Sequence, residues 1–217
     1  MSKGYRTVFF DLDGTLTDPG EGITNSVAYA LEHFGIQTAN KKSLECFIGP
    51  PLVDSFTEFY GFSKAEAQEA VGVYREYFSE RGLFENRLYG GVPEMLGTLK
   101  SAGLRLAVAT SKPHVFAERI LDRFGLSGYF DFTAGSELDG TRTAKGEVIA
   151  YALERAGIRN PSGVLMVGDR RHDAEGAAQN HMDCAGVLYG YGSREELEQA
   201  GVKYLVTAPD ELCPILI

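Results

Sequence analysis

An apolar run that stops at two aspartates constrains the fold of this chain more than any other feature. Residues 8–10 are strand-forming, and Asp11 and Asp13 follow them with one leucine between. Gly14 then permits a tight turn. Because ligands of open α/β sheets bind at the carboxyl ends of the strands, we expect a buried strand with Asp11 facing a ligand. The alternative is that the two aspartates only cap a turn, since Asp, Gly and Thr are common turn residues.

Strand and helix patterns alternate along the second half of the chain. The expected helices cover residues 93–102, 115–124, 145–156 and 174–179. The expected strands cover residues 104–109, 130–134, 164–167, 184–188 and 204–206. Repeated β-α units predict an α/β fold in which a parallel sheet has helices on both faces.

Residues 18–86 show helical periodicity and no strand-like alternation. The helical stretches cover residues 23–34, 42–47, 52–60 and 63–81, separated by Gly and Pro. We therefore predict a core domain of residues 1–17 and 87–217 and an inserted helical domain of residues 18–86. Two thin connections, 18–22 and 83–91, suggest that the insertion acts as a lid.

Further polar residues follow three of the later strands. Thr110 and Ser111 come after the strand 104–109, and the helix that begins near Pro113 offers free backbone amides for an anion. Asp169 and Asp173 lie four residues apart after another strand. Taken alone, Thr110 is equally well explained as a plain helix cap.

Lys145 begins a predicted helix after a loop that contains Gly and Thr. A lysine is unfavourable at the positive end of a helix dipole unless a negative group lies nearby. The alternatives are a solvated surface lysine, or Arg142 in the same role.

The four aspartates converge in this prediction with only Lys145 to offset their charge. Carboxylates held together repel one another, so they need protonation or a cation. Mg²⁺ fits because it prefers oxygen ligands, binds few carboxylates and accepts a phosphate oxygen.

The motifs resemble those of the haloacid dehalogenase superfamily, most of whose members are magnesium-dependent phosphatases. The matching segments are Asp-Leu-Asp-Gly-Thr-Leu at 11–16, Thr110 with Ser111, Lys145, and Gly-Asp with a second Asp four residues on at 168–173. The family often has Asn where Ser111 stands and a small hydroxyl residue where Arg170 stands. The resemblance implies a Rossmann-like doubly wound parallel sheet with an inserted α-helical cap.

The same resemblance implies a role for each matching residue. Asp11 would be the nucleophile that forms an aspartyl-phosphate, and Asp13 the general acid and base. The phosphate would be bound by Thr110, by Lys145 and, through its backbone, by Ser111. The Mg²⁺ ligands would be the Asp11 carboxylate, the Asp13 carbonyl and the Asp169 carboxylate. Asp173 would lie next to these ligands without binding the ion directly. The roles of Arg170, Arg171 and His172 stay open.

Asp13 also distinguishes branches of the superfamily. The dehalogenases need no metal and typically lack this second aspartate, whereas the ion pumps carry Thr there. The helical insertion and the segment 89–92 resemble the phosphoglycolate phosphatase-like branch. The loop 49–52 is a candidate specificity segment, although an ordinary helix–helix turn explains it equally well. We expect Phe56, Phe59, Tyr60 and Phe62 to form the core of the insertion rather than a base-stacking surface.

Four functions are therefore compared. The leading one is a magnesium-dependent phosphatase of small phosphorylated metabolites, of the phosphoglycolate phosphatase type. A 5′-nucleotidase on nucleoside monophosphates and a β-phosphoglucomutase-like phosphomutase use the same machinery. A non-catalytic binding or regulatory protein is the remote alternative, because all the acidic motif positions are present.

Composition narrows the partners and the compartment. The formal net charge of −9 and the lack of a dense basic run disfavour nucleic acid as a partner. Three cysteines, Cys46, Cys184 and Cys213, are widely spaced, which argues against a disulfide framework or a zinc site. With no signal-peptide pattern and no long apolar run, we expect a cytoplasmic protein without membrane contact. Whether it is a monomer or a homodimer is left open.

Overall fold

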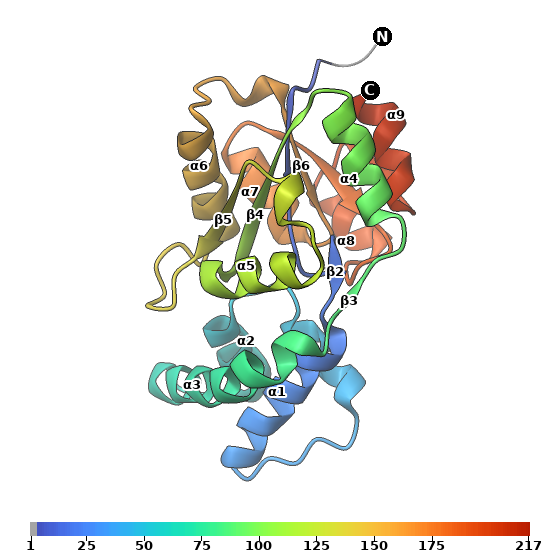
Figure 1. Ribbon diagram of the computed structural model, residues 1–217. Helices are drawn as coiled ribbons and strands as arrows, with labels where there is room; N and C mark the ends of the chain where they lie inside the picture. The colour runs from blue at the N-terminus through green and yellow to red at the C-terminus, as the bar shows by residue number, and fades with distance from the viewer. Residues whose placement is uncertain (1–3) are drawn as a thin grey trace. The chain divides into compact units, whose positions relative to one another are not determined.

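The computed structural model describes residues 4–217 and divides into two compact units. The first comprises the described residues up to Asp18 together with Leu88–Ile217, and the second comprises Pro19–Arg87. The first unit is a parallel sheet with flanking helices and the second is helical (Figure 1). Among residues 4–217, no helix combines the length and the hydropathy that crossing a bilayer requires.

The first unit is built on a six-stranded sheet in the order β5-β4-β1-β6-β7-β8, as Figure 1 shows for its central strands. The strands are β1 (Thr7–Phe10), β4 (Arg105–Pro113), β5 (Phe132–Ser136), β6 (Val164–Gly168), β7 (Asp183–Val187) and β8 (Tyr204–Val206). Every neighbouring pair is parallel. The predicted doubly wound parallel sheet is thus confirmed.

Strand β1 lies at the point where the order of the strands reverses. Its last residue, Phe10, is paired with Val108 of β4 on one side and with Val167 of β6 on the other. The residues that follow these three positions therefore emerge at one edge of the sheet. Ligands of open α/β sheets bind in the crevice at such a switch point.

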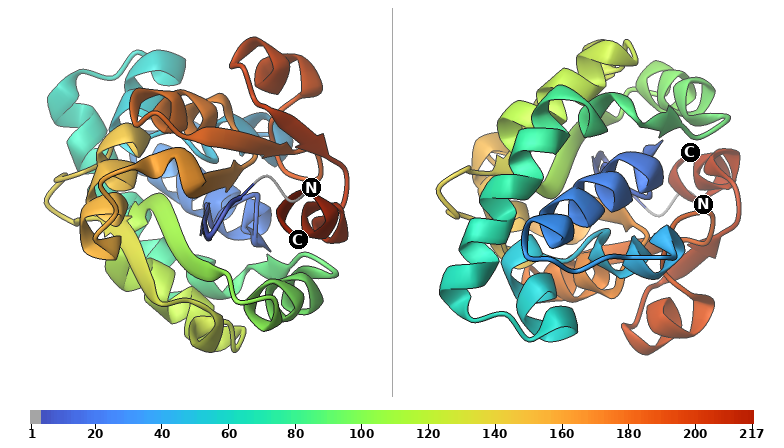
Figure 2. Two further views of the ribbon diagram at one scale, coloured as in Figure 1. Left: turned by 90° about the horizontal axis from the view of Figure 1, so that it is seen from above. Right: turned by 90° about the horizontal axis from the view of Figure 1, so that it is seen from below.

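Helices cover both faces of the sheet (Figure 2). One face carries α6 (Lys145–Ala156) and α7 (Arg171–Gln179), and the other carries α4 (Val92–Ser101), α5 (His114–Arg123) and α9 (Cys213–Leu216). Under α6 and α7, apolar side chains from alternate strand positions form a core cluster that includes Phe9, Ala107, Ala109, Ala134, Val148, Ile149, Met166, Ala174, Ala177 and Cys184. Because helices cover both faces, most side chains along the strands are buried in apolar surroundings. Polar side chains can therefore gather only at the strand ends.

The helical unit contains α1 (Gly20–His33), α2 (Leu52–Tyr60), α3 (Lys64–Glu80) and the 3₁₀ segments Lys41–Phe47 and Gly82–Phe84. Ser63 and Glu66 form a capping box at the start of α3, which satisfies two backbone donors there. A Cβ on Gly22 would lie 1.9 Å from the carbonyl oxygen of Gly82, so this approach of α1 requires glycine.

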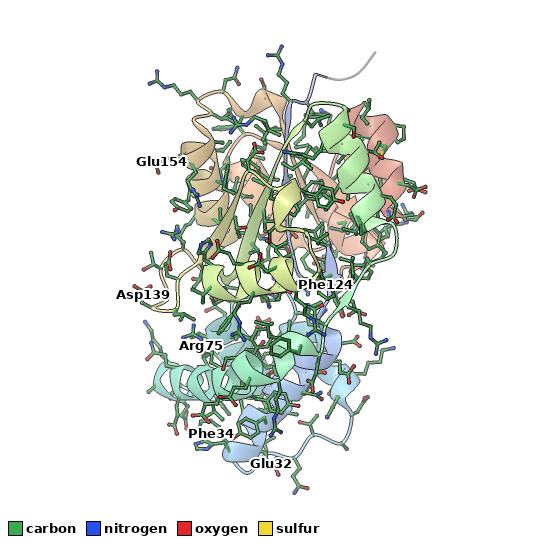
Figure 3. All side chains as sticks on the ribbon, viewed as in Figure 1. Glu32, Phe34, Arg75, Phe124, Asp139 and Glu154 are labelled. Atoms are coloured by element: carbon green, nitrogen blue, oxygen red, sulfur yellow. The ribbon has the colours of Figure 1, made fainter. Side chains whose placement is uncertain are left out.

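An aromatic cluster fills the helical unit. Phe56 and Phe62 are buried and stack with ring centroids 5.8 Å apart, and Phe34, labelled in Figure 3, lies 4.8 Å from Phe62. Phe59 is 41% exposed although its ring contacts Phe47. The expected core role is therefore confirmed for Phe56 and Phe62, whereas Phe59 lies at the edge of the cluster.

Several element bounds differ from the sequence prediction. Strand β4 runs four residues past the predicted end at 109, because 110–113 stay extended beside β5. Residues 42–47 form 3₁₀ helix rather than α-helix, and β5 begins at Phe132 because Ser127–Tyr129 form a 3₁₀ turn. The short helix α8 (Arg194–Gln199) was not predicted, since Leu197 is the only residue it buries and so gives no periodic pattern.

Candidate active site

Three predicted aspartates meet at the switch point beside β1. Asp11 follows β1 and Asp169 follows β6, and the Asp11 N–H donates to the Val167 carbonyl oxygen over 2.9 Å. Asp173 comes from the first turn of α7. One carboxylate oxygen from each of the three aspartates lies within 4.8 Å of the others, and all three residues are buried. Such crowding of buried carboxylates requires compensating charge.

Glycines form a close cradle around Asp169. A Cβ on Gly14, where φ is +85°, would lie 2.1 Å from Asp169 Oδ2. A Cβ on Gly190 would lie 2.4 Å from the Asp169 Cβ, and one on Gly192 would lie 1.9 Å from the Asp169 carbonyl oxygen. Only glycine fits at these three positions. The sequence identified Gly14, but nothing local marked Gly190 and Gly192, because they approach Asp169 from the loop after β7.

Lys145 joins two of these aspartates. Its Nζ lies 2.6 Å from Asp11 Oδ1 and 2.8 Å from Asp173 Oδ1, and it donates to the Ala109 carbonyl oxygen over 3.2 Å. Burial lowers the pKa of Lys145, but the Asp11 and Asp173 carboxylates outweigh that effect and raise it above its usual value. Lys145 is therefore charged at neutral pH and is not a solvated surface lysine.

A second buried lysine corrects the expectation that only Lys145 offsets the carboxylates. The Nζ of Lys112 lies 2.6 Å from Asp13 Oδ2, and its side chain is 5% exposed. Lys112 lies two residues after Thr110 on β4, in the segment where the register with β5 shifts. The sequence prediction ended this strand at 109 and began a helix near Pro113, so it did not single out Lys112.

Thr110 and Ser111 occupy the same extension of β4. Thr110 is buried, and its Oγ1 accepts the N–H of Lys112 over 3.2 Å. The N-cap of α5 is Pro113, so the alternative in which Thr110 caps that helix is wrong. Ser111 is half-buried, and its carbonyl oxygen accepts the Ser136 hydroxyl over 2.7 Å.

The electrostatics of the site leave room for a cation. Asp11, Asp13, Asp169 and Asp173 are buried against only Lys112 and Lys145 among the described buried groups, so two negative charges stay uncompensated if all are ionised. Burial raises the pKa of Asp13 despite Lys112, raises that of Asp169 well above its usual value, and raises that of Asp173 to about 6. A divalent cation would remove this penalty.

The oxygens at the site also suit a metal ion such as Mg²⁺. Asp169 Oδ2 accepts the Tyr191 N–H over 2.8 Å, while Asp169 Oδ1 is buried and has no hydrogen-bond partner among residues 4–217. Both carboxylate oxygens of Asp173 already have partners, because Oδ1 binds Lys145 and Oδ2 accepts the Arg170 N–H over 3.1 Å. Asp11 and Asp169 are therefore the side chains best placed to bind a hard, oxygen-seeking cation.

The structure shows the surroundings of the residues whose roles the sequence analysis left open. Arg170 Nε lies 2.9 Å from Glu196 Oε1, and the same oxygen accepts the Arg171 N–H over 2.9 Å. Glu196 comes from α8, so Arg170 ties the loop after β6 to that helix. Burial and the two arginines lower the pKa of His172, which keeps it neutral at pH 7.

Fold and site together define a hydrolase of the haloacid dehalogenase type. The model of the family described as haloacid dehalogenase-like hydrolase matches residues 8–187, which include the strand ends carrying Asp11, Lys112 and Asp169. The chain belongs to this family, as its motifs predicted, and is a phosphatase-type enzyme.

Individual relatives carry different names, and one of those names is that of a kinase. The chain is 51% identical to the 5′-nucleotidase of Pseudomonas aeruginosa over 89% of this chain and 87% of that protein. It is 40% identical to the tyrosine-protein kinase PtkA of Mycobacterium tuberculosis over 94% and 70%, and 30% identical to the phosphoglycolate phosphatase of Aquifex aeolicus over 86% of each. A solved structure of a predicted phosphatase from Clostridium acetobutylicum superposes with a TM-score of 0.95 at 48% identity and covers 97% of both chains.

Proposed function

We propose that the protein is a magnesium-dependent phosphomonoesterase that works through an aspartyl-phosphate on Asp11. The observation that carries the proposal is the separate pairing of two neighbouring aspartates. Asp11 is held by Lys145, while Asp13, two residues later, is held by Lys112. One carboxylate can therefore act as nucleophile while the other handles protons.

The first half of the reaction is transfer of the phosphoryl group to Asp11. A carboxylate oxygen of Asp11 forms a bond to phosphorus as the ester P–O bond breaks, and Asp13 gives its proton to the leaving oxygen. Asp13 Oδ1 has no hydrogen-bond partner among the described residues, which leaves it available, and burial raises the pKa of Asp13, which favours the protonated form that a general acid needs. Lys145 and Thr110 offset charge on the phosphoryl oxygens.

The second half regenerates the enzyme. Asp13, now ionised, takes a proton from water, the water oxygen bonds to phosphorus, and the bond from phosphorus to Asp11 breaks. Held by Asp11, Asp169 and the Asp13 carbonyl, Mg²⁺ would neutralise charge on the carboxylates and on the phosphoryl group. Ser111 would contribute a backbone contact to the phosphate.

For the substrate we place a nucleoside 5′-monophosphate first and phosphoglycolate second. The 51% identity to a protein named 5′-nucleotidase exceeds the 30% identity to one named phosphoglycolate phosphatase, and this reverses the order that the motifs suggested. The catalytic residues are common to both reactions. The choice of substrate therefore depends on residues outside the motifs, and the loop 49–52 is a candidate determinant.

Phosphate release from a substrate panel tests this proposal. The panel contains nucleoside monophosphates, phosphoglycolate, sugar phosphates and an aryl phosphate, each with Mg²⁺ and with a chelator. Asp11→Asn serves as the blank, and Glu154→Gln, an exposed change on α6 labelled in Figure 3, is the matched control. We expect Mg²⁺-dependent release, fastest from a nucleotide, that Asp11→Asn abolishes and Glu154→Gln preserves. Wild-type release no greater than the blank on every compound would refute phosphatase function for these substrates.

A further inference from the structure

The loop after β7 contacts the site through Tyr191 in two directions. Its main-chain N–H donates to Asp169 Oδ2 over 2.8 Å, and its side-chain hydroxyl donates to Asp18 Oδ1. Asp18 ends β2 (Thr17–Asp18) and is the last residue of the first unit before the chain enters the second. A single residue thus holds both a candidate metal ligand and the start of the first connection between the units.

The neighbours of Tyr191 make this link tight. Gly190 and Gly192, on either side of it, approach Asp169 and Gly14 too closely to accept a Cβ, so the backbone of residue 191 is pressed against Asp169. Tyr189 supports the same segment, because its hydroxyl donates to the Thr15 carbonyl oxygen over 3.1 Å. Its ring packs against Tyr89, near the returning connection, with centroids 5.0 Å apart.

We propose that Tyr191 is a positioning residue that couples the Asp169 carboxylate to the first connection at Asp18. The inference rests on the proposed function in that it takes Asp169 as a metal ligand. The N–H of Tyr191 engages Oδ2 and thereby leaves Oδ1, which has no partner among the described residues, for the cation. The bond from the hydroxyl to Asp18 restrains the segment that carries this N–H.

Two consequences follow from such a coupling. Without the tyrosine hydroxyl, the loop is ordered only when the cation binds. The free-energy cost of that ordering then reduces the affinity for Mg²⁺. Coupling between two sites is reciprocal, so Mg²⁺ must also protect the amides of residues 17 and 18 from hydrogen exchange, and this protection must depend on the hydroxyl.

A double-mutant cycle tests the link. The variants are Tyr191→Phe, Asp18→Ala and the double variant, and Tyr5→Phe is the control because its hydroxyl binds Asp183 at the opposite end of the sheet. Mg²⁺ affinity is measured by calorimetry, and hydrogen exchange of the residue 191 amide is measured in metal-free protein. We expect each single variant to weaken Mg²⁺ binding about fivefold and to speed this exchange about fivefold. The double variant should be no worse than either single variant.

The outcomes separate this inference from the proposed function. Wild-type affinity and wild-type exchange in Tyr191→Phe would overturn the inference, as would an equal loss in Tyr5→Phe or additive losses in the double variant. Failure of the wild type to bind Mg²⁺ would instead count against the proposed function. The exchange of the residue 191 amide in metal-free protein would still decide whether the hydroxyl restrains this loop. If Tyr191→Phe does not fold, Asp18→Ala removes the same bond from its other partner.

Discussion

The two ends of the central sheet both carry a lysine paired with acidic groups, but in opposite surroundings. At the carboxyl end, Lys145 pairs with Asp11 and Asp173, and all three side chains are at most 6% exposed. At the amino end, Lys203 pairs with Asp183, and these side chains are 41% and 35% exposed. Exposed pairs contribute little to stability because water solvates the separated charges well. Burying charged groups costs desolvation free energy, and proteins gather such groups at functional sites. The buried cluster therefore points to function at the carboxyl end.

A change from carboxylate to amide should give the largest difference between the two ends. Asp13→Asn removes the proposed acid and base, so we expect turnover to fall by about 10²- to 10⁴-fold. Asp183→Asn makes the same chemical change at the amino end and should leave turnover near that of the wild type. Steady-state phosphate release with Mg²⁺ measures both. Near-normal turnover of Asp13→Asn would remove Asp13 from the mechanism.

Loss of the lysines should separate the two ends in stability. Lys145→Met leaves Asp11 and Asp173 buried without compensation, so we expect metal-free protein to lose about 3 kcal/mol of unfolding free energy. Lys203→Met should cost less than about 1 kcal/mol, because its partner Asp183 is open to water. Urea unfolding of the two variants and the wild type, each with a chelator, gives these values. Equal losses would show that burial does not distinguish the two clusters.

The sequence was sufficient for the parts of the site that follow a local pattern. Asp11 and Asp169 each follow an apolar strand, so strand periodicity placed both. Lys145 begins a helix, but the choice of Lys145 over Arg142 came from the resemblance to the family. Lys112 was missed because β4 continues through residues that resemble a turn. Tyr191 could not be found at all, because its contacts with Asp169 and Asp18 join segments about 20 and more than 170 residues apart.

The smallest expected effect concerns a further ion cluster at the amino end, where Asp131 accepts hydrogen bonds from Lys100 Nζ over 3.0 Å and from Arg105 Nε over 3.2 Å. Partial burial raises the pKa of Asp131, but these two cations outweigh it, so the pKa lies below its usual value. A carboxyl group with a lowered pKa in the folded state stabilises the protein above its unfolded-state pKa of about 3.9. That stability is lost as the pH falls through the folded-state value.

Asp131→Asn should therefore be less stable than the wild type by about 0.5 kcal/mol at pH 7, and the difference should shrink as the pH falls below about 3.9. Urea unfolding of both proteins across this pH range measures the effect, and high salt should reduce it at pH 7 because the groups are partly exposed. A difference that stayed constant with pH would show that Asp131 acts through packing rather than charge. The charges of the cluster at the amino end would then contribute nothing to stability, unlike those of the buried site.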